Sequence, residues 1–207
     1  MQFVDDLIGN DHSPQFNSRG HRCRELEEIN LHNYFLFAGD NVGLGLDKDV
    51  TETYPYIVSK ALKTDYYNLC VFNGGVDCLR YNLLTWLNKN KEKPRAIIVS
   101  YEFLNSVIVS DHNFENLKSC DLDDIITQDL LDMAQDTGFF KMRNYLADKL
   151  ITRLVNIPIF QINFSDKQNV FTTNITNIDF DGHTHDHKTI ASLLIRNIRM
   201  KQEKAKP

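Results

Sequence analysis

Short apolar runs alternate along this chain with longer amphipathic stretches, and this alternation constrains the fold more than any other feature of the sequence. The apolar runs have the length of buried strands and lie at 34–37, 67–72, 96–101 and 158–164. The helix-like segments lie at 53–63, 76–90, 122–134, 139–155 and 187–199. Repeated strand–helix units predict an α/β fold in which helices cover both faces of a mainly parallel sheet.

The ends of the chain are expected to flank one domain. Within 187–199, Ile190, Leu193, Leu194 and Ile198 recur at helical spacing, which predicts a helix with one stripe packed on the sheet. The basic residues 201–207 are expected to form a solvated tail. Since no repeat and no proline- or glycine-rich linker divides the chain, we expect one domain at 31–200, with an N-terminal extension at 1–30 packed on it.

Composition excludes several classes of protein. The chain has 207 residues, of which 42% are hydrophobic and 25% charged, so it can bury a substantial core. A net charge of −5 argues against nucleic acid as a partner. The sequence has no apolar stretch of about 18 residues and begins with acids rather than the bases of a signal peptide, so we expect no membrane span and a cytoplasmic location.

The cysteines give no indication of a cofactor. Cys23, Cys70, Cys78 and Cys120 are widely spaced, and none belongs to the C-x-x-C pair that zinc or redox sites commonly use. We interpret them as reduced thiols.

The residues after the first predicted strand are candidates for a ligand site, because ligands in open α/β sheets bind outside the carboxyl ends of strands. Here the strand is followed by the run Gly39–Gly45, GDNVGLG. Its three glycines permit a tight turn and expose backbone N–H groups at the start of the next helix. A dinucleotide fingerprint would need another glycine after Gly43-Leu-Gly45, so no nucleotide cofactor is indicated. Taken alone, the run favours a plain strand–helix turn over a ligand site.

Three segments in order carry a resemblance to a known family. These are Asn17–Glu25 (NSRGHRCRE), Phe35–Asp40 (FLFAGD) and Thr51–Pro55 (TETYP). Together they resemble the SGNH (GDSL-like) hydrolases, in particular phage-encoded members in which N-S-x-G-x-R-x-x-E precedes G-D-S and E-T-x-P follows. The resemblance implies an SGNH hydrolase-like, flavodoxin-like three-layer α/β/α sandwich.

The resemblance continues to the end of the chain. Residues 67–75 are similar to the segment that holds the family's glycine, and 98–106 to the segment that holds its asparagine. The run Asp181–His187 (DGHTHDH) stands where the family keeps its aspartate and histidine, directly before the last helix. If the chain is phage-encoded, as these members are, the resemblance implies the virion as an alternative to a cytoplasmic location.

One position departs from the family in a way that changes the chemistry. In the family, the serine after Gly-Asp attacks an ester carbonyl while a histidine takes its proton and an aspartate orients the histidine. Here Asp40 is followed by Asn41. An amide has no hydroxyl to ionise, and neither Val42 nor Gly43 offers one. The acyl-enzyme route is therefore absent if the positions correspond.

The remaining family positions are partly kept. By resemblance, Gly74 or Gly75 supplies an oxyanion-hole N–H and Asn105 a side-chain donor, and we expect these to bind ligand together with Asp40 and Asn41. A turn at the two glycines and a strand-end cap at Asn105 are the structural alternatives.

The histidine-rich run is open to more than one interpretation. The resemblance assigns the general base to His183, with His185 as the alternative, and the orienting carboxylate to Asp181 or Asp179. A metal site is the second interpretation, because these histidines lie close to Asp181 and Asp186. Local histidine runs are usually solvated and no distant ligand is evident, so we expect no metal here. Asp186 is explained as the N-cap of the last helix.

Two functions from different classes remain open. The first is a binding or structural protein, a pseudoenzyme whose cleft holds a small acyl or carbohydrate ligand or whose surface meets a protein partner or a second copy. The second is an esterase or deacylase in which water, activated by His183 and Asp181, replaces the serine. Asn41 favours the first, since a fold alone does not establish chemistry.

Overall fold

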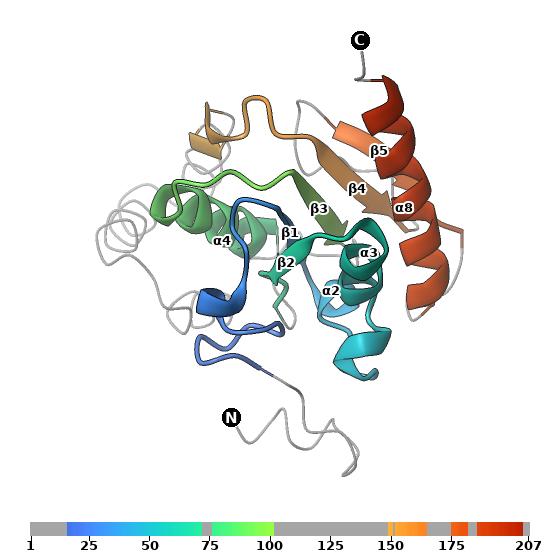
Figure 1. The fold of residues 1–207 in the computed structure, drawn as a ribbon, viewed down its shortest axis with the longest axis horizontal. Helices are drawn as coiled ribbons and strands as arrows, with labels where there is room; N and C mark the ends of the chain where they lie inside the picture. The colour runs from blue at the N-terminus through green and yellow to red at the C-terminus, as the bar shows by residue number, and fades with distance from the viewer. Residues whose placement is uncertain are drawn as a thin grey trace.

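The computed structural model describes residues 16–71, 76–101, 149–150, 152–164, 175–181 and 186–204. Within them, five strands form one sheet (Figure 1). The strands are β1 (Tyr34–Gly39), β2 (Asp65–Asn68), β3 (Ala96–Tyr101), β4 (Ile159–Asn163) and β5 (Ile175–Asp179). Their spatial order is β2-β1-β3-β4-β5, and each neighbouring pair is parallel. This confirms the predicted α/β class, and the order is that of flavodoxin-like folds.

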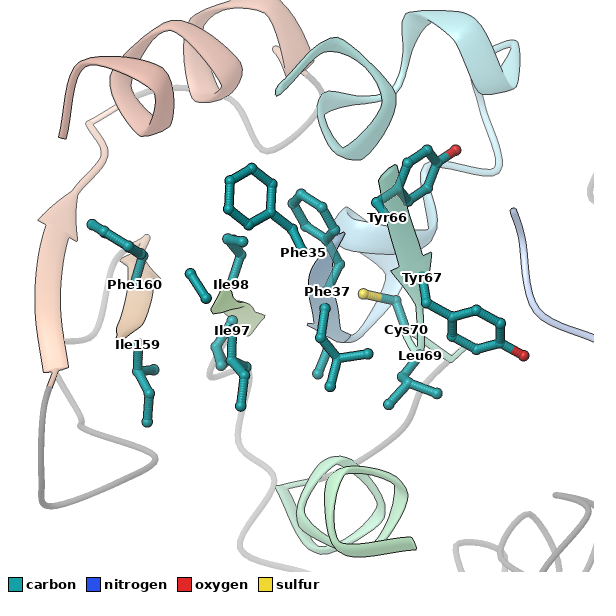
Figure 2. Packing of buried hydrophobic residues seen from close by; sticks show 14 of the residues in the cluster. Phe35, Phe37, Tyr66, Tyr67, Leu69, Cys70, Ile97, Ile98, Ile159 and Phe160 are labelled. Carbon is teal, nitrogen blue, oxygen red and sulfur yellow. The ribbon is translucent and has the colours of Figure 1, made fainter. Parts of the chain in front are cut away.

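Helices cover both faces of the sheet. The α-helices are α2 (Asn41–Leu44), α3 (Tyr54–Leu62), α4 (Val76–Lys89) and α8 (His187–Lys204), and the short 3-10 helices are η1 (Leu26–Glu28) and η2 (Val50–Glu52). α3 packs against α8 on one face, and α4 lies against the other (Figures 1 and 2). The predicted three-layer arrangement is thereby confirmed. Among the described residues, no helix has the length and apolar character needed to cross a membrane.

The core sits in the two spaces between the sheet and its helices. Figure 2 shows Phe35, Phe37 and Phe160 pointing toward α3 and α8, whereas Ile97 and Ile159 point toward α4. This division follows from the alternation of side chains along a strand. All six residues of β1 are buried, as expected for a strand covered on both faces, and that is why its sequence is an unbroken apolar run.

The predicted segments match the structure to different degrees. The helices predicted at 53–63 and 76–90 are α3 and α4, and the predicted terminal helix is α8, which continues to Lys204. Its predicted stripe is confirmed, because Ile190, Leu194 and Ile198 are buried. The segment 122–134 lies outside the described residues. Of 139–155, residues 149, 150, 152 and 153 are helical.

Two strands correct the sequence prediction. The strand expected at 67–72 begins earlier, because Asp65 and Tyr66 already pair with β1, and regular pairing ends at Asn68. β5 was not predicted at all. It lies at the edge of the sheet and its sequence, Ile-Thr-Asn-Ile-Asp, leaves most side chains partly or fully exposed.

Candidate functional site

The candidate site lies at the carboxyl edge of the sheet, where β1 and β3 run side by side. β2 lies on one side of β1 and β4 lies beyond β3, so the strand order reverses between β1 and β3. Ligands in such sheets bind at this switch point. Asp40 follows β1 directly, and its N–H donates to the Ser100 carbonyl of β3 at 3.3 Å. The residues after β1 are therefore held at the edge where a ligand is expected.

A single helical turn presents Asp40 and Asn41. The Asp40 carboxylate accepts a hydrogen bond from the Val42 N–H at 3.3 Å and so caps α2. Asn41 is the first residue of α2 and is exposed. Gly45 ends the turn in the left-handed conformation, with φ of 60°, and its N–H donates to the Asn41 carbonyl at 2.8 Å. The predicted pair thus lies together, with Asn41 facing solvent.

A buried polar cluster lies beneath this turn. The Tyr54 hydroxyl and the Ser100 hydroxyl are 2.6 Å apart and hydrogen-bonded. A Cβ built on Gly43 would lie 2.2 Å from the Cys70 sulfur, 2.9 Å from the Ser100 Oγ and 3.0 Å from the Tyr54 hydroxyl oxygen. Only glycine leaves α2 room to sit this close to the sheet.

None of these buried groups is placed to act as a nucleophile toward a ligand at the edge of the sheet. Cys70, Ser100 and Tyr54 are each at most 2% exposed. Burial raises the pKa of the Cys70 thiol and of the Tyr54 hydroxyl well above their usual values. Since the thiolate is the nucleophilic form of cysteine, Cys70 is held in an unreactive state.

Arg22 fixes the other end of α2. Its buried guanidinium donates to the carbonyls of Leu44, at 2.9 Å, and of Gly45 and Lys48. These carbonyls belong to the end of the helical turn and the loop after it, where no following helical turn supplies N–H groups to donate to them. Burial lowers the pKa of Arg22. A single side chain from a distant segment therefore shapes the loop after β1.

The segment Asn17–Glu25 forms a closed loop that places Arg22. The Asn17 Oδ1 accepts from the N–H groups of Arg19, at 3.1 Å, and His21, at 2.9 Å. Ser18 donates from its N–H and its hydroxyl to the Glu25 carboxylate at 2.8 and 2.7 Å. The polar residues that gave this segment its resemblance thus make a structural unit.

His187 joins α8 to the same region. Its ring is buried, stacks on Tyr54 with centroids 5.7 Å apart, and accepts the Tyr54 N–H at Nδ1 over 3.1 Å. A Cβ on Gly45 would lie 3.0 Å from its Cε1 atom. His187 was not among the residues predicted to form the site. Helical spacing from Ile190 places it on the core face, and that spacing could have revealed it.

The acidic residues lie farther along the same edge. Asp181 is exposed and follows β5, and the Asp179 Oδ1 accepts from Asn163 at 3.2 Å. β5 is three strand positions from β1, which corresponds to about 14 Å at the usual spacing of neighbouring strands. Asp186 accepts from the Thr189 N–H at 3.1 Å, which confirms its N-cap contact. Hydrogen bonds from the Thr189 side chain and then from its backbone N–H lower the pKa of Asp186.

The other predicted site residues are not tested. His183, His185, Gly74, Gly75 and Asn105 lie outside the described residues. Within the described ranges, no group of three or more His, Cys, Asp or Glu side chains is arranged to hold a metal ion.

Comparisons with known proteins add the following. No family model and no curated protein matches the sequence. Solved structures with similar folds include a carbohydrate esterase family 2 enzyme with a carbohydrate binding domain from Corynascus thermopiles (Myceliophthora fergusii), at 9% identity, TM-score 0.49 and 80% coverage of this chain. An acetyl xylan esterase from the rumen bacterium Butyrivibrio proteoclasticus gives 14% identity, TM-score 0.49 and 84% coverage. A carbohydrate esterase whose active site displays divergent catalytic and non-catalytic binding functions gives 12% identity, TM-score 0.47 and 82% coverage of this chain. The match spans 65% of the length of each of these chains.

Proposed function

We propose that this chain is an SGNH hydrolase-like protein that binds a small acyl or carbohydrate ligand at the carboxyl edge of its sheet and has no serine nucleophile. The observation that carries the proposal is the position of Asn41, exposed at the start of α2 directly after the capping residue Asp40. An amide side chain offers two N–H donors and one carbonyl acceptor. It is therefore suited to hold the carbonyl or hydroxyl groups of a ligand.

Binding is favoured over serine-type chemistry by what surrounds α2. Nucleophilic catalysis needs a hydroxyl or thiol in contact with both a base and the substrate. The hydroxyl and thiol groups that pack under Gly43 belong to Tyr54, Ser100 and Cys70, which are buried away from solvent. A ligand at the carboxyl edge would meet Asn41 instead.

A water-mediated esterase is the second candidate, and one observation favours it. Asp181 is exposed at the edge that also carries Asp40, and His183 follows it by two residues. A histidine held by a carboxylate can act as a general base toward water. In this proposal His183 takes a proton from the water that attacks the acyl carbonyl.

Hydrolysis of p-nitrophenyl acetate distinguishes the two candidates. We expect the native protein to match buffer, Asn41→Ser to hydrolyse the ester, and Asn41→Ser combined with His183→Ala to lose that activity. His32→Ala is the matched control, since His32 is an exposed histidine before β1. Turnover by the native protein that disappears in His183→Ala, and survives in His32→Ala, would instead establish the water-mediated esterase.

Ligand binding is tested separately, by isothermal titration with methyl 6-O-acetyl-glucoside. Replacing Asn41 with alanine removes the hydrogen-bonding amide from an exposed position, so we expect binding to weaken about tenfold while the melting temperature stays unchanged. Equal affinity in the native protein and Asn41→Ala would refute a binding role for this residue.

A further inference from the structure

A second cavity lies away from the candidate site, at the amino end of the edge strand β2. It has a volume of about 610 Å³, is open to solvent on one side, and is lined by α3, by the start of β2, by η2 and by the Asn17–Glu25 loop. We call it the α3–β2 cavity. Its wall includes Tyr56 and Ser59 of α3 and Thr64 and Tyr66 at the start of β2. It shares no residue with the carboxyl edge around Asp40 and Asn41, and its volume lies within the range of small-molecule sites.

Two side chains in this wall have hydrogen-bonding capacity that the protein does not use. Ser59 is 3% exposed and Thr64 is 9% exposed, and neither hydroxyl oxygen has a hydrogen-bond partner among the residues that the structure describes. Buried hydroxyls are normally bonded, so an unpartnered pair beside one cavity calls for an explanation. Both residues line the cavity, so a rotation about χ1 that exposes the hydroxyl would let an occupant bond to it.

The charges around the cavity balance one another. Arg24 forms an ion pair with Asp65, and Glu25 accepts hydrogen bonds from Ser18. Lys60 is exposed on the same wall. Two cationic and two anionic side chains therefore line the cavity, which favours an uncharged ligand over an anion or a cation.

Aromatic rings supply the apolar part of the wall. Tyr66 is buried, Tyr56 is partly buried, and Phe16 is 38% exposed at the rim. Rings of this kind pack against apolar C–H faces, while hydroxyls bond the polar groups at a ligand's edge. A sugar ring has both features in one molecule.

We propose that the α3–β2 cavity is a binding site for a neutral saccharide of one or two rings. The sugar hydroxyls bond to Ser59 and Thr64, and a C–H face of the ring packs on Tyr56 or Tyr66. This site is independent of the ligand site proposed at Asn41, because the two lie on different elements and use different residues.

The test is a ¹H–¹⁵N NMR titration of the full chain with cellobiose, maltose and lactose, with glucose 6-phosphate as the charged probe. At least one neutral disaccharide is expected to shift the amides of Ser59, Thr64 and Tyr66 with a Kd of about 1 mM or tighter. Ser59→Ala and Thr64→Val are each expected to weaken this binding about tenfold. Both remove a hydroxyl that has no partner, so the melting temperature is expected to stay the same or rise.

Matched variants locate the site and its preference. Ser192→Ala removes a hydroxyl from the exposed side of α8, outside the cavity, and is expected to leave saccharide affinity unchanged. Lys60→Gln removes one of the two cations in the wall and tests whether a charged probe binds through it. Absence of shifts with all three neutral sugars would overturn the proposal. So would binding that Ser59→Ala and Thr64→Val leave intact, or binding of glucose 6-phosphate alone that Lys60→Gln abolishes. Loss of disaccharide binding in Asn41→Ala would place the sugar at the carboxyl edge and refute this location.

Discussion

Replacing Gly43 with alanine tests whether close packing beneath α2 fixes the turn that carries Asn41. The added Cβ would lie 2.2 Å from the Cys70 sulfur, well inside the separation of about 3.5–4.0 Å at which non-bonded atoms attract. Overpacking of a buried site usually costs about 1–3 kcal/mol. Alanine regains up to about 1 kcal/mol of helix propensity, although α2 is a single turn. We therefore expect Gly43→Ala to lower the free energy of unfolding by about 1–2 kcal/mol.

A double-mutant cycle identifies the contact responsible. Cys70→Ala removes the sulfur that the new Cβ would meet, so Gly43→Ala combined with Cys70→Ala is expected to lose less stability than the two single variants together. The coupling is expected to be about 0.5–3 kcal/mol, measured by urea unfolding of the four proteins.

Gly20→Ala is the matched control for this cycle. Gly20 has a φ of 75°, and no atom of the described residues lies within 4 Å of a built Cβ. Alanine there meets backbone strain without such a contact, so Cys70→Ala should not relieve it. Strict additivity of Gly43→Ala and Cys70→Ala, or a Gly43→Ala variant as stable as the native protein, would refute the packing explanation.

Three further predictions concern the groups around α2 and the core. Arg22→Met leaves three carbonyl acceptors without their donor. We expect it to lower the free energy of unfolding, measured by urea titration, by about 3–5 kcal/mol, and a loss smaller than about 0.5 kcal/mol would contradict this. His187→Phe keeps an aromatic ring against Tyr54 but removes the acceptor of its N–H, for an expected loss of about 1–3 kcal/mol, which an unchanged melting temperature would disprove. Burial raises the pKa of Cys23 from 9.0 to about 12, so the folded state disfavours the thiolate. The contribution of the neutral Cys23 thiol to the free energy of unfolding is therefore full below pH 9 and is lost as the pH rises toward 12. Cys23→Ala should flatten the fall in stability at alkaline pH, measured by urea unfolding at several pH values. A stability–pH profile identical to that of the native protein would count against this.

The central strands were predictable from sequence because they are buried on both faces. β1, β3 and β4 therefore appear as apolar runs whatever packs against them. β5 escaped detection because a strand at the sheet edge tolerates Thr176 and Asn177, which remove the apolar signal. β2 begins at Asp65, whose carboxylate accepts the Asn30 N–H at 2.7 Å. A polar residue that is bonded only through tertiary contacts cannot be recognised as a strand start from sequence.

The candidate site was predictable only in part, for a similar reason. Asp40 and Asn41 were found because they follow the first strand, and their position depends on chain order alone. Arg22 and His187 were missed as residues of this region because their burial depends on contacts with segments far away in the chain, at 44–48 and at Tyr54. Of the two, only His187 could be recognised from its neighbours in sequence, because its helical spacing to Ile190 indicates the buried face of the last helix.

The residues that hold and present α2 divide into two groups by their contacts. Gly43 and Arg22 are fixed by buried neighbours on β3, on α3 and in the loop after α2, so substitution there disturbs the fold. Asn41 is exposed, and a change at that position need not disturb the packing beneath it. Selection for stability alone would therefore preserve the first group whatever side chain stood at position 41. The same division makes Asn41→Ser the informative variant, since it alters the chemistry of one exposed side chain on a turn whose shape is set by Arg22 and Gly43.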